Sequence, residues 1–183
     1  MLKPRRIKMV DPQEYLLEFW KKHSGFTLIE MMVVVVVLAI MAAIAMPAYS
    51  EYVRKASAAQ AEQEMQKIAG QLERYKSKNF TYKYFDPKIV YSDDASAPSL
   101  SIINVPVGSV GDKIKYKITL RDLDDTSKEL SNSAVRGSGW AMQAVAVNDS
   151  KNYNFLMTSK GLRCKTIDSI TYTACTGSKV ISW

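Results

Sequence analysis

Histidine is nearly absent from this chain of 183 residues, whose one imidazole belongs to His23. Catalytic proton transfer at neutral pH and most zinc sites depend on histidine. The lack of histidine after residue 23 therefore argues against a histidine-dependent hydrolase and against a zinc enzyme. For the same reason Ser138, between Gly137 and Gly139, is not read as a catalytic nucleophile. We expect no catalytic residue, no metal site and no cofactor in this protein.

Cysteine is also scarce, and its two copies, Cys164 and Cys175, lie close to the C-terminus. In an oxidising compartment the two thiols can pair, and closing this loop would stabilise the fold by about 3 kcal/mol in the chain-entropy model. In a cytosolic protein they would remain free thiols. The membrane segment described below predicts export, which favours the disulfide.

Acidic residues are fewer than basic ones, 18 against 25, and the formal net charge is +7. After Gly25 the chain holds 19 basic and 15 acidic residues, so +4 remains downstream. This mild excess gives only weak support to nucleic-acid binding. Two groups of cations are nevertheless candidates for contacts to DNA phosphates: Lys113, Lys115 and Lys117, and Lys160, Arg163 and Lys165. The alternative is that lysines on the wet face of a strand discourage edge pairing and keep the domain soluble.

Charge is almost missing between Phe26 and Ala48, where 20 of 23 residues are apolar. As a helix this run would be about 35 Å long, and a membrane's hydrocarbon core is about 30 Å thick. Lys21 and Lys22 precede it, so the positive-inside rule predicts a cytoplasmic N-terminus and a C-terminal part outside.

Glu30 separates three interpretations of this apolar run. A secretory signal peptide could be cut near Ala45, giving a mature chain that starts at Met46. A plain membrane anchor would remain uncut. Neither accounts for Glu30, since a carboxylate in lipid costs about 2.5 to 3.5 kcal/mol on insertion scales, although near the interface its side chain could reach water.

The third interpretation gives Glu30 a partner. If the chain is cut after Gly25, the α-amine of Phe26 becomes a new positive charge at the start of the helix. Glu30 of one copy could then pair with the amine of a neighbouring copy in a helical array. A subunit docked out of register would bury an unpaired charge, which is costly.

The sequence Gly25-Phe26-Thr27-Leu28-Ile29-Glu30, the valine-rich run after it, and Pro47 resemble the N-terminal segment of type IV pilins and of the related pseudopilins of type II secretion. The resemblance implies that a prepilin peptidase cuts between Gly25 and Phe26 and N-methylates Phe26. It also implies that Glu30 and Pro47 serve filament assembly. The implied partners are other pilin subunits, the peptidase and the assembly platform of the inner membrane.

The resemblance implies a structural subunit, and a minor pilin is favoured. Such a subunit resides in the inner membrane with its head in the periplasm and is then assembled into an extracellular pilus. The filament would serve adhesion, twitching motility or DNA uptake. Some minor pilins resemble this chain in size and in a C-terminal disulfide and act as DNA receptors in natural transformation. A pseudopilin of a secretion system is the alternative.

The rest of the sequence predicts an α+β fold, with a helix over about residues 26–78 packed on a small antiparallel sheet. One face of its second half is apolar at helical spacing, and Pro47 predicts a kink or weak point. Strands are expected at 113–120, 140–147 and 153–158, with a shorter one at 102–105. A tail over 159–183, irregular or partly stranded, would be closed by the cysteines. Asp122, Asp124 and Asp125 are read as a solvated turn rather than a calcium loop.

These elements give three predicted parts: a leader (1–25), a hydrophobic helix for the membrane or the filament core (26–53) and a globular head (54–183).

Overall fold

The computed structural model describes residues 25–94, 96–177 and 179–183. The predicted leader, apart from Gly25, lies outside the described residues, as does His23. The chain divides into two compact units, one ending at Ala48 and the other running from Tyr49 to Trp183. The second unit contains all of the predicted head, residues 54–183.

Helix α2 runs from Leu28 to Asn79 and includes Pro47, so the proline does not end the helix. These bounds agree with the predicted 26–78. The apolar stripe is confirmed, because its members face the sheet: Ala61, Met65, Ile68 and Leu72 are fully buried and Tyr75 is partly buried.

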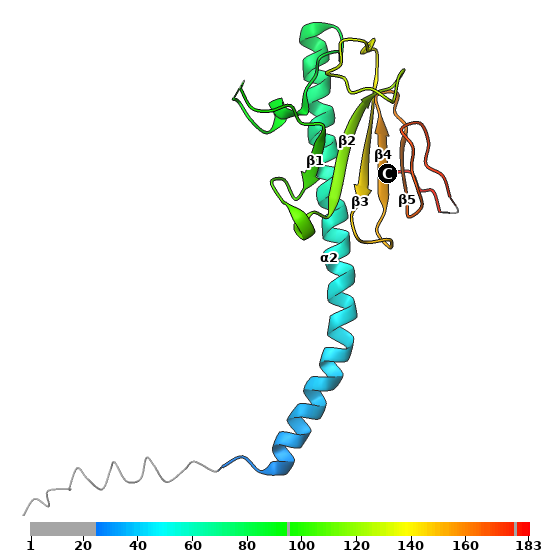
Figure 1. The fold of residues 1–183 in the computed structure, drawn as a ribbon. Helices are drawn as coiled ribbons and strands as arrows, with labels where there is room; N and C mark the ends of the chain where they lie inside the picture. Colours follow the sequence, from blue (N-terminus) through cyan, green and yellow to red (C-terminus); the bar gives the residue numbers. More distant parts are fainter. Residues whose placement is uncertain (1–24, 95, 178) are drawn as a thin grey trace, which may run out of the picture. The chain divides into compact units, whose positions relative to one another are not determined.

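The head contains one antiparallel sheet with the strand order β1-β2-β3-β4-β5, which follows the order of the sequence (Figure 1). Its strands are β1 (Ile102–Val105), β2 (Tyr116–Asp122), β3 (Trp140–Ala146), β4 (Asn154–Thr158) and β5 (Arg163–Thr166). Two short 3-10 helices, η1 (Pro87–Val90) and η2 (Gly111–Lys113), lie in the connections. The α+β class and the four expected strands are confirmed, and β5 lies in the tail that was expected to be irregular or partly stranded.

The predicted strand at 113–120 begins later than expected, at Tyr116. Lys113 closes η2, whose first residue Gly111 has a φ of +59°. Glycine adopts this left-handed conformation readily, and it turns the chain before the strand starts. Lys115 continues the ladder by one step, since its N–H donates to the carbonyl of Val105 at 2.7 Å.

The hydrophobic core lies between α2 and one face of the sheet. Alternation along the strands places the helix-facing residues in register, as in Ile103, Ile118, Ala144 and Phe155 on four neighbouring strands. The side chains of the opposite face, here called the outer face, include Lys117, Thr119, Gln143 and Leu156. Leu156 is fully buried although it points away from the helix.

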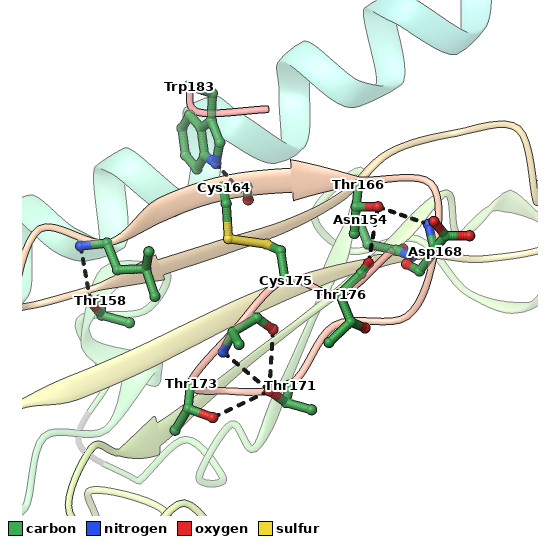
Figure 2. The surroundings of a disulfide bond; sticks show 12 residues. Asn154, Thr158, Cys164, Thr166, Asp168, Thr171, Thr173, Cys175, Thr176 and Trp183 are labelled. Atoms are coloured by element: carbon green, nitrogen blue, oxygen red, sulfur yellow. Dashed lines mark hydrogen bonds between the residues drawn. A yellow bond between two sulfur atoms is a disulfide. The ribbon is translucent and has the colours of Figure 1, made fainter. Parts of the chain in front are cut away.

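The C-terminal segment explains part of this outer burial. Cys164 and Cys175 form the predicted disulfide, which ties the segment to strand β5 (Figure 2). The Tyr172 hydroxyl donates to Oγ1 of Thr119 at 2.8 Å, so the segment reaches the outer face of β2. Ile181 then pairs with Lys165 beside β5, and the Trp183 indole donates to the carbonyl of Cys164 (Figure 2). The tail is thus partly stranded, which is one of the two forms expected for it.

Asp122 departs from the expectation of a solvated turn, because its side chain is completely buried. Its carboxylate accepts backbone N–H groups from Asp124 and Asp125 at 2.9 Å and from Gly137 at 3.0 Å. These three hydrogen bonds offset the free-energy cost of burying the carboxylate. Asp122 is therefore the anchor of the long β2–β3 connection.

Candidate nucleic-acid interface and filament-assembly segment

The proposed cleavage position lies immediately before helix α2. Gly25, Phe26 and Thr27 are exposed and precede the helix, which begins at Leu28. Thr27 acts as the N-terminal cap, since its hydroxyl accepts the N–H of Glu30 at 3.2 Å and its carbonyl accepts the N–H of Met31. An amine at Phe26 would therefore lie just ahead of the first helical turn.

Glu30 occupies that first turn, where the helix dipole favours a negative charge. The residues after it expose a continuous apolar surface, which includes Val35, Ile40 and Ile44. Among the described residues, α2 is the one helix long and apolar enough to cross a membrane, with a mean hydropathy of 2.9 in its most apolar window. Exposed apolar surface of this size indicates contact with lipid or with other protein chains.

The six cations proposed from the sequence do not form one surface. Lys115 and Lys117 are exposed and alternate with helix-facing residues of β2, so they point to the outer face. Lys113 is exposed in η2, next to the start of that strand. These three residues form a group that we call the β2 lysines.

Lys160 and Arg163 lie at the other end of the sheet. Lys160 is in the turn between β4 and β5, and Arg163 pairs with Met157 on the side that faces the helix. Since β2 ends where β4 ends, this turn and the β2 lysines are separated by the length of the strands, about 20 Å.

Lys165 is occupied by contacts within the head. Its ammonium lies 3.5 Å from a carboxylate oxygen of Glu62 on α2. It also lies 5.6 and 5.8 Å from the ring centres of Tyr153 and Phe155. Lys165 therefore covers an edge of the core rather than joining the β2 lysines.

A further group of cations is accompanied by exposed aromatic rings and was not proposed from the sequence. We call it the basic–aromatic cluster, and its members are Lys76, Lys78, Phe80, Lys83, Tyr84 and Arg136. The end of α2 and the following loop supply the first five, and the β2–β3 connection supplies Arg136. The stretch from Lys76 to Phe85 interleaves cations with aromatic residues, which was the available sequence signal.

Backbone hydrogen bonds bring these segments together. The Tyr82 N–H donates to the carbonyl of Gly137 at 2.9 Å, and the Tyr84 N–H donates to the carbonyl of Leu130 at 2.7 Å. A Cβ added to Gly137 would clash with the backbone nitrogen of Lys83, so the two segments are in close contact. The loop after α2 is therefore fixed against the β2–β3 connection that begins at Asp122.

Tyr82 contacts a member of the cluster through its ring. The Lys76 ammonium lies 4.7 Å from the centre of its ring, and its hydroxyl donates to Glu73 at 2.8 Å. Burial, together with the hydrogen bond to Glu73, raises the pKa of the Tyr82 hydroxyl to about 12. Tyr82 thus remains a neutral donor to Glu73 at physiological pH.

The described part of the chain shows no arrangement typical of a metal site. No group of three or more histidine, cysteine, aspartate or glutamate side chains is placed to hold an ion among the described residues. A cavity of about 410 Å³ lies between α2 and the start of β2, where Arg54 pairs with both Glu51 and Asp149. The charged side chains at this cavity form an ion-pair network.

Comparison with known proteins matches two parts of the chain. Residues 20–46 match the family model of the prokaryotic N-terminal methylation motif. Residues 47–168 match the model described as type IV minor pilin ComP, DNA uptake sequence receptor. No curated protein and no solved structure matches the chain significantly. Pilins are a structural, non-enzymatic family, and the apolar helix fits a membrane-anchored pilin that is later assembled into a pilus.

The two matches meet at residues 46 and 47 and together run from the apolar helix through strand β5. The second covers about two thirds of the chain, including the β2 lysines and the basic–aromatic cluster. The long helix, the antiparallel sheet and the disulfide agree with this assignment. The chain belongs to the ComP family of type IV minor pilins.

Proposed function

We propose that this minor pilin binds DNA at the cell surface and contributes to its uptake. The observation that carries this proposal is the match to the DNA-receptor family, because it spans the whole sheet and every cation proposed for contacts to DNA. Adhesion and twitching motility are the alternatives, and a pseudopilus role is not favoured by the minor-pilin match.

The β2 lysines are the first candidate for phosphate contacts. Protection of a sheet edge does not account for them, because β2 pairs with β1 on one side and β3 on the other. Lysines on an interior strand are not needed to block edge pairing. Point charges on a wet sheet face suit the sequence-neutral part of DNA binding, which depends strongly on salt.

Lys160 and Arg163 form a second candidate, at the opposite end of the sheet. Arg163 is exposed, and its guanidinium can bind a phosphate through two parallel hydrogen bonds. Lys165 is included in the proposal only as a support, since its ammonium already faces Glu62.

A charge-reversal series tests the proposal and separates the two candidates. The full-length protein in detergent micelles would be titrated into labelled duplex DNA at low and moderate salt, with fluorescence anisotropy as the readout. One double variant is Lys115→Glu with Lys117→Glu, and the other is Lys160→Glu with Arg163→Glu. Lys55→Glu with Lys179→Glu is the matched control, because it changes the net charge equally at exposed lysines elsewhere.

We expect the β2 double variant to weaken duplex binding at least about tenfold and to lower the salt slope by about 2, one for each lost phosphate contact. The control should retain binding within about threefold of the wild type. Absence of duplex binding by the wild type, or equal losses in all three variants, would contradict a specific DNA surface on this head.

We also propose the processing and assembly steps implied by the N-terminal segment. The leader 1–25 is removed by the prepilin peptidase between Gly25 and Phe26, and Phe26 is methylated. The helix over 26–53 resides in the inner membrane and then in the filament core, while 54–183 forms the head outside. Glu30 sets the register between subunits, and Pro47 belongs to the segment that is extracted from the membrane. The assembly platform of the inner membrane is a further partner. The methylation motif and the capped start of α2 at Thr27 support this proposal.

A further inference from the structure

Phe80 and Tyr84 are large aromatic residues that the fold leaves in water. Phe80 is 89% exposed and Tyr84 is 58% exposed. The other aromatic residues of this loop, Tyr82 and Phe85, are buried in the core. Aromatic rings are normally among the first groups to be buried, so the exposure of this pair needs an explanation.

Both of these exposed residues have an unusual backbone conformation. The φ angles are 60° at Phe80 and 66° at Tyr84, in the left-handed region that bulky residues rarely occupy. Glycine or asparagine would fit there with less strain. Outliers of this kind cluster at binding sites, where the surrounding structure holds them in place.

The surrounding structure does hold this loop. Its backbone is pinned at Tyr82 and Tyr84 to the β2–β3 connection, and the Thr81 hydroxyl adds a bond to the carbonyl of Gly137 at 3.1 Å. On the helix side the Tyr75 hydroxyl donates to the carbonyl of Lys83 at 3.1 Å. The two rings are therefore presented from a rigid support, which reduces the entropy lost when a ligand binds.

The charges around the rings indicate the kind of ligand. Lys78 and Arg136 are exposed, and Lys83 lies 5.2 Å from the centre of the Tyr84 ring. Cations beside exposed aromatic platforms are the pattern that binds single-stranded nucleic acid, where the cations follow the phosphates and the rings stack on bases. Duplex DNA hides its base faces unless a step is opened.

We infer that Phe80 and Tyr84 stack on unpaired bases, so that the basic–aromatic cluster binds single-stranded or locally opened DNA. This inference rests on the proposed function and assigns to the head a contact distinct from the β2 lysines. The β2 lysines hold the phosphates of a duplex, and the basic–aromatic cluster recognises a place where the strands separate.

The test compares three labelled probes of one sequence: a single strand, an intact duplex, and a duplex with a central unpaired bubble. Full-length protein in detergent micelles is titrated by anisotropy, and 2-aminopurine in the bubble reports stacking directly. Phe80→Asn and Tyr84→Asn remove the rings while suiting the left-handed backbone. Phe80→Trp is the conservative variant, and urea unfolding checks that each variant keeps its fold.

We expect the double asparagine variant to lose about tenfold in affinity per stacked base for the single strand and the bubble, with an unchanged salt slope. Its affinity for the intact duplex should stay within about threefold of wild type, and Phe80→Trp should keep the 2-aminopurine signal. Unchanged single-strand binding, or an equal loss on intact duplex, overturns the inference while leaving the proposed function standing. A wild type that binds none of the three probes overturns the proposed function itself, and a wild type that binds only the intact duplex overturns this inference alone.

Discussion

At the scale of single residues, Asp122 shows how a charged group can organise a loop that carries other residues. Its buried carboxylate accepts three backbone N–H groups, two through one oxygen and the third, from Gly137, through the other. The carbonyl of Gly137 in turn accepts Tyr82 of the basic–aromatic cluster. A side chain that touches no proposed ligand thus sets the position of a proposed binding surface.

Asp122→Asn should lower the free energy of unfolding by about 1 to 3 kcal/mol, because the amide nitrogen would face a backbone donor and leave it unsatisfied. Urea unfolding of the full-length protein in detergent, followed by tryptophan fluorescence, measures this. Asp124→Asn is the matched control, since Asp124 is exposed and should change stability by less than about 0.5 kcal/mol. Equal effects of the two substitutions would show that the buried carboxylate is not the anchor of this connection.

At the scale of elements, the helix and strands with a periodic sequence pattern could be predicted, whereas elements without such a pattern could not. The stripe of α2 and the alternating part of β2 could be read because burial imposes periods of 3.6 and 2 on the sequence. Strand β5 has only four residues, Arg163–Thr166, with cations at two positions, and it forms because it pairs with β4. The basic–aromatic cluster depends on a bond between Tyr82 and Gly137, which local sequence does not reveal.

The disulfide-closed segment after β5 is the element whose stability rests most on one covalent link. Replacing Cys164 and Cys175 with serine should lower the free energy of unfolding by about 3 kcal/mol, because the opened loop gains chain entropy in the unfolded state. It should also expose Leu156 on the outer face of the sheet, increasing the binding of a hydrophobic dye. Reductant should reproduce the loss in the wild type and have no effect on the double variant. An unchanged urea midpoint would mean that contacts such as Tyr172 to Thr119 hold the segment without the disulfide.

At the scale of the whole molecule, the chain combines one surface suited to an apolar environment with another suited to water. The apolar surface after Glu30 suits lipid or neighbouring helices, whereas the head presents cations and two exposed aromatic rings to water. A pilin must pass from the membrane into a filament without losing its register. Specificity at that step is expected to come from the one charge in the apolar run, since apolar contacts alone do not select a register.

Glu30→Val should therefore leave membrane insertion intact and lower incorporation into filaments at least about tenfold, because the Phe26 amine of a neighbouring copy would be buried unpaired. The measurement is the ratio of this subunit in sheared filaments to that in whole cells. Mass spectrometry of the mature chain checks separately that cleavage still yields methylated Phe26. Glu51→Gln serves as the control, since Glu51 lies on the same helix but pairs with Arg54 of its own chain. Filaments containing Glu30→Val at the wild-type ratio would show that register is set without this charge, and a mature chain starting at Met46 would show that the segment is a cleaved secretory signal.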